Sequence, residues 1–199
     1  LRGWKMPEGQ EGHWQAKNWV LDYDAESEAK GDKSLWTEED FGNFVLIVDW
    51  RQPRKPKPEQ APVILPDGSE SLDANGKPKT VEVMDAGDSG IYIRGTSKSQ
   101  INIWNWPCGS GEIWGYRKDM KMPPEVRRAA TPLFKADNPP GRWNRFVITA
   151  IDDNVTVVLN GKTVIMNAKL PGIPKKGPIA LQHHGDPIQF ANIYIKELD

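Results

Sequence analysis

Apolar and polar residues alternate with a period of two along most of this chain, the pattern of strands that bury one face. A short helix is indicated only at residues 123–130, which begin with two prolines. Asn160-Gly161 separates two alternating segments and is typical of a two-residue hairpin turn. The pattern predicts an all-β fold, a two-sheet antiparallel β-sandwich. The predicted strands are residues 43–52, 90–95, 100–104, 145–151, 155–159, 162–166, 177–183 and 188–196.

One long stretch, residues 53–82, interrupts the alternation. It is rich in Pro, Lys, Asp and Gly, with a brief apolar run at residues 63–65. The apolar strands on both sides look like parts of one core, so we interpret residues 53–82 as a loop insertion between strands. The chain is therefore predicted to be a single domain, 1–199. Loops of this length are usually functional or mobile.

Composition narrows the classes of function. A chain of 199 residues buries roughly 70% of its unfolded surface, and the single cysteine, Cys108, has no internal disulfide partner. The 26 basic and 27 acidic residues give a formal charge of −1, which disfavours a nucleic-acid partner. No apolar run approaches the ~18 residues of a membrane span. The sequence lacks a Gly-rich phosphate loop, a Cys pair for zinc and a Gly-x-Ser-x-Gly elbow, so we expect no cofactor.

The alternation also predicts which side chains face outward, once the aliphatic residues are assigned to the core. Solvated strands favour Thr, Lys, Glu and Ser, whereas this outward set gathers aromatic rings, amides and charged groups. Aromatic faces stack on sugar rings while amides bind hydroxyls, so the set predicts a carbohydrate cleft. If some of these strands belong to the other sheet, the outward side chains do not lie together in one cleft. The set is Asp49, Arg51, Tyr92, Arg94, Gln100, Asn102, Trp104, Gln182, His184 and, with residues 110–116 taken as a strand, Glu112, Trp114 and Tyr116.

The three histidines differ in their expected roles. His13 is expected in a loop, and His183, which alternates with Leu181, is expected to pack and hydrogen-bond. His184 leaves its strand toward Gly185-Asp186 and is the better candidate for acid or base chemistry. Adjacent histidines near an aspartate also occur in metal sites, but no spaced ligand pattern accompanies them, and we expect no metal.

Several segments in order resemble the 3-keto-disaccharide hydrolase domain family. Asp88-Ser89-Gly90-Ile91-Tyr92-Ile93-Arg94 resembles its Asn-Ser-Gly-Ile-x-x-Arg motif, and the resemblance extends from about Gly3 to Leu198. It implies a concanavalin-A-like jelly roll, a substrate whose C3 hydroxyl is oxidised to a ketone, and a periplasmic or extracellular location. The other matching segments are residues 35–44, 140–144, 157–161, 177–187 and 190–193.

The resemblance implies elimination chemistry. A C3 ketone acidifies the C2 proton, so a base can remove it and expel the anomeric oxygen by β-elimination; addition of water then gives net hydrolysis. This needs a base, a donor for the enolate oxygen and an acid at the leaving group. His184 is expected as base and Arg94 as the enolate or ketone contact. Glu112 or Asp49 is expected as acid, or as base with His184 as acid.

Substrate contacts are expected from the remaining outward residues. Gln100, Asn102 and Gln182 would bind hydroxyls, Trp104 and Trp114 would stack on the sugar, and Tyr92 and Arg51 would complete the cleft. Many relatives have Glu at the position of Gln100. If that Glu is catalytic in the relatives, this chain carries the carboxylate at another position, such as Glu112, or has lost activity.

Three other functions stay open at this stage. The first is a non-catalytic glycan-binding module on the same fold, the second a conventional glycoside hydrolase, and the third a purely structural domain. No Glu-x-Asp-x-x-Glu strand, expected of sandwich-fold glucanases, is present. Since jelly rolls host both lectins and enzymes, site geometry must separate these functions.

Overall fold

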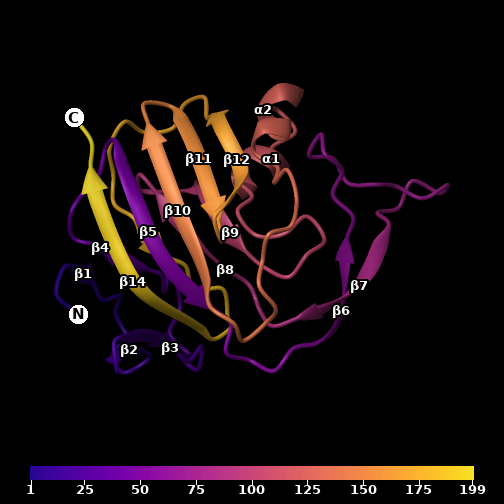
Figure 1. The fold of residues 1–199 in the computed structure, drawn as a ribbon. Helices are drawn as coiled ribbons and strands as arrows, with labels where there is room; N and C mark the ends of the chain where they lie inside the picture. Colours follow the sequence, from indigo (N-terminus) through magenta and orange to yellow (C-terminus); the bar gives the residue numbers. More distant parts are fainter.

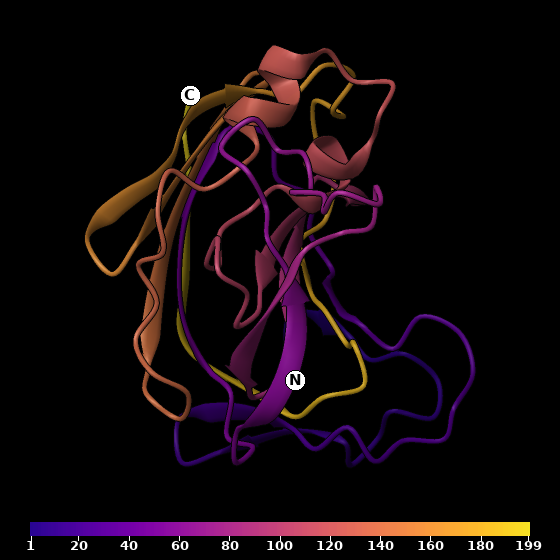
Figure 2. The same cartoon turned by 90° about the vertical axis from the view of Figure 1, so that its right-hand side faces the viewer.

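Two antiparallel sheets packed face to face form the molecule, as the computed structural model of residues 1–199 shows (Figures 1 and 2). The predicted two-sheet sandwich is confirmed. One sheet has the order β12-β11-β10-β5-β14-β3-β2 and the other β1-β4-β13-β8-β9. The seven-stranded sheet comprises β2 (Trp14–Lys17), β3 (Val20–Tyr23), β5 (Phe44–Arg51), β10 (Asn144–Ile151), β11 (Asn154–Leu159), β12 (Lys162–Lys169) and β14 (Ile188–Glu197). The five-stranded sheet comprises β1 (Trp4–Lys5), β4 (Leu35–Thr37), β8 (Ser89–Ile93), β9 (Thr96–Ile103) and β13 (Ala180–Leu181).

The core lies between the sheets and is filled by the alternating apolar positions. In β5 these are the four even-numbered residues from Phe44 to Trp50, all nearly inaccessible to solvent. The five-stranded sheet contributes isoleucines, among them Ile91 and Ile101, which pair directly across β8 and β9. Each fully buried side chain of this size stabilises the fold by roughly 1.5–3 kcal/mol.

The segment after β9 differs from its predicted strand. Residues 110–116 form only a bridge between Ile113 and Ile101, and helix α1 (Trp114–Lys118) begins directly afterwards. Gly111 has a φ of 102°, which ends the extended run. Tyr116 is buried in the core and does not face outward. The helix predicted near residues 123–130 is present as α2 (Pro124–Ala129).

The insertion is a hairpin with its own strands. β6 (Lys57–Pro62) pairs along its length with β7 (Thr80–Asp85), and this ribbon projects from the sandwich beside the five-stranded sheet (Figure 1). Between the two strands the chain makes further bridges, Ile64 to Glu70 and Leu72 to Pro78. The insertion is therefore ordered by backbone pairing. No helix in the structure is both long and apolar enough to cross a bilayer.

Candidate functional site

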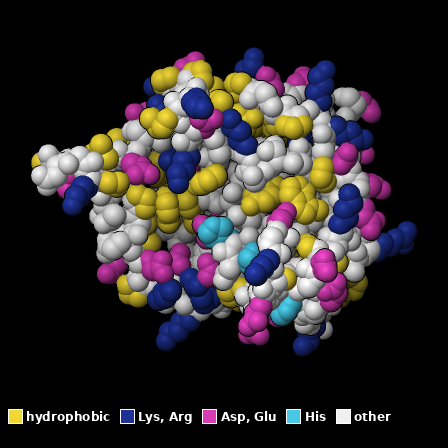
Figure 3. All heavy atoms as spheres, turned by 180° about the vertical axis from the view of Figure 1, so that it is seen from behind, with side chains coloured by type: hydrophobic (Ala, Val, Ile, Leu, Met, Phe, Trp, Pro, Cys, Tyr) yellow, Lys and Arg dark blue, Asp and Glu magenta, His cyan; other side chains and the backbone are white.

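The outer face of the five-stranded sheet brings together most of the predicted site residues. Tyr92 lies opposite Gln100 and Ala180, while Gly90 lies opposite Asn102. Because the isoleucines of the same strands face the core, these residues point outward. Seen from behind (Figure 3), this side of the molecule shows histidine and acidic side chains between two hydrophobic patches.

Three amides form the floor of this face. Gln100 Nε2 donates to Asn102 Oδ1 at 2.6 Å and to Gln182 Oε1 at 2.8 Å. A Cβ at position 90 would lie 2.7 Å from Gln100 Nε2, so Gly90 leaves the space in which this side chain packs. All three amides are buried, and they hold one another in a fixed polar platform.

Two pairs of aromatic side chains are associated with the same sheet. Trp36 lies beside Tyr92 with ring centroids 5.7 Å apart, and Trp104 stacks on Trp106 at 3.7 Å. Trp104 is buried and donates its indole N–H to Gly109 O, so Trp106 is the more accessible ring of its pair. Burial raises the pKa of Tyr92 to about 12, and the Asp32 carboxylate adds to this shift. Trp36 and Trp106 were missed because no alternating run predicted them to face outward with the amides.

A histidine–carboxyl pair lies at the amino-terminal end of β8, where Asp88 directly precedes the strand. His184 Nδ1 is 3.8 Å from Asp88 Oδ2. Burial raises the pKa of Asp88 to about 7; the Asp186 and Asp85 carboxylates add to the shift, whereas His184 opposes it. Asp88 Oδ1 is buried without a hydrogen-bond partner. A carboxyl that titrates near neutral pH can donate or accept a proton in a reaction.

Asp88 was not among the expected site residues. The available signal was its place at the start of the Asp88-Ser89-Gly90 segment, where the family motif has Asn. His183, the neighbour of His184, packs edge-on against Tyr23 at 5.1 Å, as its expected packing role requires. Burial lowers the pKa of His183, and Lys33 and His184 add to this effect. No group of His, Cys, Asp and Glu side chains with metal-binding geometry is present.

Glu112 lies next to the amide platform but is enclosed. Its backbone carbonyl accepts the N–H of Asn102, which places it beside β9. The carboxylate is fully buried and paired with Arg117 of α1, whose guanidinium also donates to Gly68 O of the insertion. Glu112 Oε2 has no partner. The insertion and α1 therefore cover this carboxylate and separate it from the exposed side chain of His184.

Three expected site residues lie elsewhere. Asp49 and Arg51 point away from the core on the seven-stranded sheet, the opposite side of the sandwich from His184. Asp49 is held by Arg145 at 2.6 and 2.8 Å and Arg51 by Gln189 at 2.5 Å. Their expected convergence with the amides is wrong, because alternation identifies a face but not the sheet to which it belongs. Trp114 begins α1 with Lys118 over its ring, so strand alternation does not apply to it.

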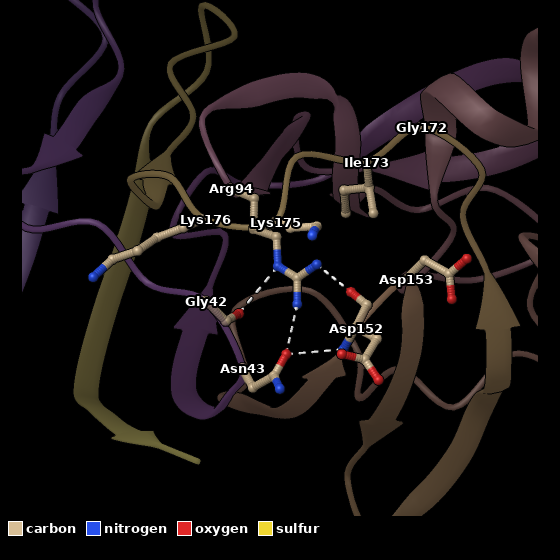
Figure 4. Close-up of a pocket in the computed structure, with 9 residues that line it drawn as sticks. All are labelled: Gly42, Asn43, Arg94, Asp152, Asp153, Gly172, Ile173, Lys175 and Lys176. Carbon is tan, nitrogen blue, oxygen red and sulfur yellow. Dashed lines mark hydrogen bonds between the residues drawn. The ribbon is translucent and has the colours of Figure 1, made fainter. Parts of the chain in front are cut away.

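Arg94 also lies outside the predicted cleft. It follows β8 with a φ of 54°, and this left-handed turn directs its side chain away from the amide platform. The guanidinium donates to Gly42 O at 3.0 Å, to Asn43 Oδ1 at 3.2 Å and to Asp152 O (Figure 4). It also donates to Pro174 O at 3.2 Å. Arg94 and Asp88 flank opposite ends of β8, roughly 20 Å apart along the strand. Its expected enolate contact is therefore wrong; Arg94 fastens loops beside a cavity of about 720 Å³.

Comparison with known proteins identifies one family. The model of the 3-keto-alpha-glucoside-1,2-lyase-like domain matches residues 1–196. A search of curated proteins found no match.

Solved structures share the fold. A candidate glycosyl hydrolase from Parabacteroides distasonis superposes with a TM-score of 0.65 at 22% identity, covering 100% of this chain and 80% of its own. A second from the same organism gives 0.60 at 18% identity, covering 99% and 89%. The carbohydrate-binding module CBM66 from Bacillus subtilis gives 0.53 at 12% identity, covering 98% and 96%.

Replacing Arg94 with Met is expected to destabilise the protein by about 3–5 kcal/mol, because buried carbonyl acceptors lose their donor. Urea denaturation at pH 7 measures the change. Arg145→Met, which removes the exposed partner of Asp49, is the control and is expected to cost about 1 kcal/mol or less. An unchanged denaturation midpoint for Arg94→Met would contradict the fastening role.

Replacing Asp88 with Asn is expected to change how stability depends on pH. A carboxyl whose pKa is raised in the folded state favours folding while protonated, and this contribution is lost as pH rises from about 4 to about 7. The amide of Asp88→Asn cannot ionise, so the variant should be more stable than wild type at pH 8 by about 1–3 kcal/mol. The difference should shrink toward zero near pH 4. Denaturation curves at both pH values measure it, and a constant difference would contradict the raised pKa.

Proposed function

The chain belongs to the 3-keto-alpha-glucoside-1,2-lyase-like domain family, and from this membership we propose that it cleaves 3-keto-glycosides at the face that carries His184 and Asp88. The observation that supports the proposal best is the His184–Asp88 pair at the end of the amide platform. One member is exposed, and the other is a carboxyl with a pKa of about 7, so both protonation states are available near neutral pH.

The proposed reaction begins with removal of the C2 proton by the His184 imidazole. The electron pair of the C2–H bond forms a double bond between C1 and C2 as the C1–O bond breaks. Protonated Asp88 donates to the departing oxygen through Oδ2, the carboxyl oxygen that lies 3.8 Å from His184 Nδ1. Addition of water across the new double bond, with OH at C1 and H at C2, completes a net hydrolysis.

The platform amides are proposed to bind the sugar. Gln182 and Asn102 supply N–H donors for the ketone or enolate oxygen, because their oxygens accept from Gln100 and leave their N–H groups available. Arg94 cannot perform this task, because its guanidinium is held by loops at the opposite end of β8. Trp36 and Trp106 supply apolar ring surface at the two sides of the platform. A periplasmic or extracellular location is part of the proposal, and fractionation of the source cells tests it.

Turnover of a 3-keto aryl glucoside, compared with the unoxidised parent glucoside, tests the activity. Wild-type protein is expected to release the aglycone from the keto substrate alone. His184→Ala and Asp88→Asn are each expected to lower kcat by about 10²–10⁴-fold, because each removes one proton-transfer group. His13→Ala is the matched control and should keep full activity, because the His13 ring pairs with Asp24 and takes no part in the His184–Asp88 pair.

The products distinguish elimination from direct hydrolysis. Deuterium at C2 of the substrate is expected to slow aglycone release if the C2–H bond breaks in the slow step. A conjugated enone among the products indicates elimination. If neither glucoside is cleaved and both bind with similar weak affinity, the catalytic proposal is wrong and the domain is a glycan-binding module.

A further inference from the structure

Arg54 joins three segments of the chain beside the proposed site. It precedes β6 at the start of the insertion and contacts Asp85, the last residue of β7, with Nη2 2.7 Å from Asp85 Oδ2. Its Nη1 pairs with Asp186, two residues after His184 in the loop between β13 and β14. One guanidinium therefore closes the base of the insertion and attaches it to the loop of His184.

Both carboxylates bound by Arg54 also hold the backbone around Asp88. Asp186 Oδ2 accepts the N–H of Asp88 at 2.9 Å, and Asp85 Oδ2 accepts the N–H of Gly87 at 3.1 Å. A Cβ at position 87 would lie 2.6 Å from Asp186 Cβ, so Gly87 lets these segments approach closely. Movement of either carboxylate would therefore move Asp88.

We propose that Arg54 is a positioning residue of the site: by pairing with Asp85 and Asp186 it fixes the backbone and the local charge around Asp88, and so controls the proton exchange of Asp88 with a bound glycoside. The exchange with a glycoside rests on the proposed function, whereas the effect of Arg54 on Asp88 does not. The insertion thereby contributes a charge that acts on the site, in addition to covering Glu112.

The charges around Asp88 give the direction of the effect. His184, Asp186 and Asp85 act on it directly, and Arg54 is the only cation bonded to either carboxylate. Further out are His183 and Tyr92 of the sheet and Glu59 of β6, which faces Asp85. Loss of the Arg54 charge leaves two uncompensated carboxylates beside Asp88, so its proton is bound more tightly.

Arg54 also affects Asp85 itself, which limits the size of the effect. Burial and Glu59 raise the pKa of Asp85, and Arg54 lowers it. Without Arg54, Asp85 takes up a proton more readily and its repulsion of Asp88 weakens. We therefore expect an upward shift of about 0.5–1 pH unit in the titration of Asp88, the amount that one charge several ångströms away produces at an intermediate dielectric.

Carboxyl ¹³C NMR of the full chain measures this shift without any substrate, with the Asp88 signal assigned by its loss in Asp88→Asn. Arg54→Met is expected to raise the Asp88 midpoint by about 0.5–1 unit, and Arg54→Lys, which keeps the charge, should restore most of the wild-type value. Arg145→Met removes an arginine–aspartate pair on the opposite sheet and is the matched control, with no expected shift. An unchanged midpoint in Arg54→Met, or an equal shift in Arg145→Met, overturns the proposal.

Asp85→Asn gives a second test with the opposite sign, which also serves if Arg54→Met does not fold. It removes one carboxylate while Arg54 remains bound to Asp186, so the Asp88 midpoint should fall. A rise, or no change, contradicts the electrostatic role.

The pH profile of kcat/KM on the 3-keto aryl glucoside connects the shift to activity. The limb assigned to Asp88 should move to higher pH in Arg54→Met and return toward wild type in Arg54→Lys. A changed NMR midpoint with an unmoved profile would show that Asp88 does not control turnover and would overturn the proposed role of Arg54 in proton exchange. If wild-type protein has no turnover, the proposed function fails, and the NMR titrations still decide the effect of Arg54 on Asp88.

Discussion

The pleat of the five-stranded sheet is the constraint on which the proposed site depends. Ile91 and Ile101 pack into the core, and the residues that alternate with them, Tyr92, Gln100 and Asn102, must therefore face outward in register. Burial of the isoleucines holds the amide platform in place. The polar residues thus require no separate scaffold, and Gly90 supplies the one gap that the side chain of Gln100 needs.

Charge is concentrated where this sheet ends. Three carboxyl groups meet there: Asp85 at the end of β7, Asp88 directly before β8, and Asp186 in the loop after β13. Arg54 forms ion pairs with Asp85 and Asp186. Burial raises the pKa of Asp88 to about 7, and the Asp186 and Asp85 carboxylates add to this shift while His184 opposes it. Such an arrangement lowers the free energy of unfolding at neutral pH, a cost often found at sites that transfer protons.

Arg94 and Arg54 show how position in the fold gives two arginines different roles. At the end of β8 opposite to Asp88, Arg94 donates to three backbone carbonyls and to Asn43, and these hydrogen bonds hold the surrounding loops together. Arg54 binds two carboxylates that touch the backbone of the proposed catalytic carboxyl, so its charge reaches the site. The insertion, which lies outside the sandwich core, therefore belongs to the site through the ion pairs at its base.

The sequence by itself determined the longer strands of the two sheets, their buried and outward faces, and the grouping of Gln100, Asn102, Gln182 and His184, because the two-residue period of a strand is local. It did not predict the short strands β1, β2 and β3 or the β6–β7 hairpin, and it predicted a strand at residues 110–116, where α1 begins. It also indicated the family through ordered motifs. Only the tertiary structure decided that Asp49 and Arg51 lie on the other sheet, since alternation does not state which strands pair. The left-handed turn at Arg94, the helix at Trp114 and the Arg54–Asp186 contact, made across 132 residues of sequence, depend on packing between distant segments. The same is true of the raised pKa of Asp88, which arises from burial and from carboxylates that the fold brings together.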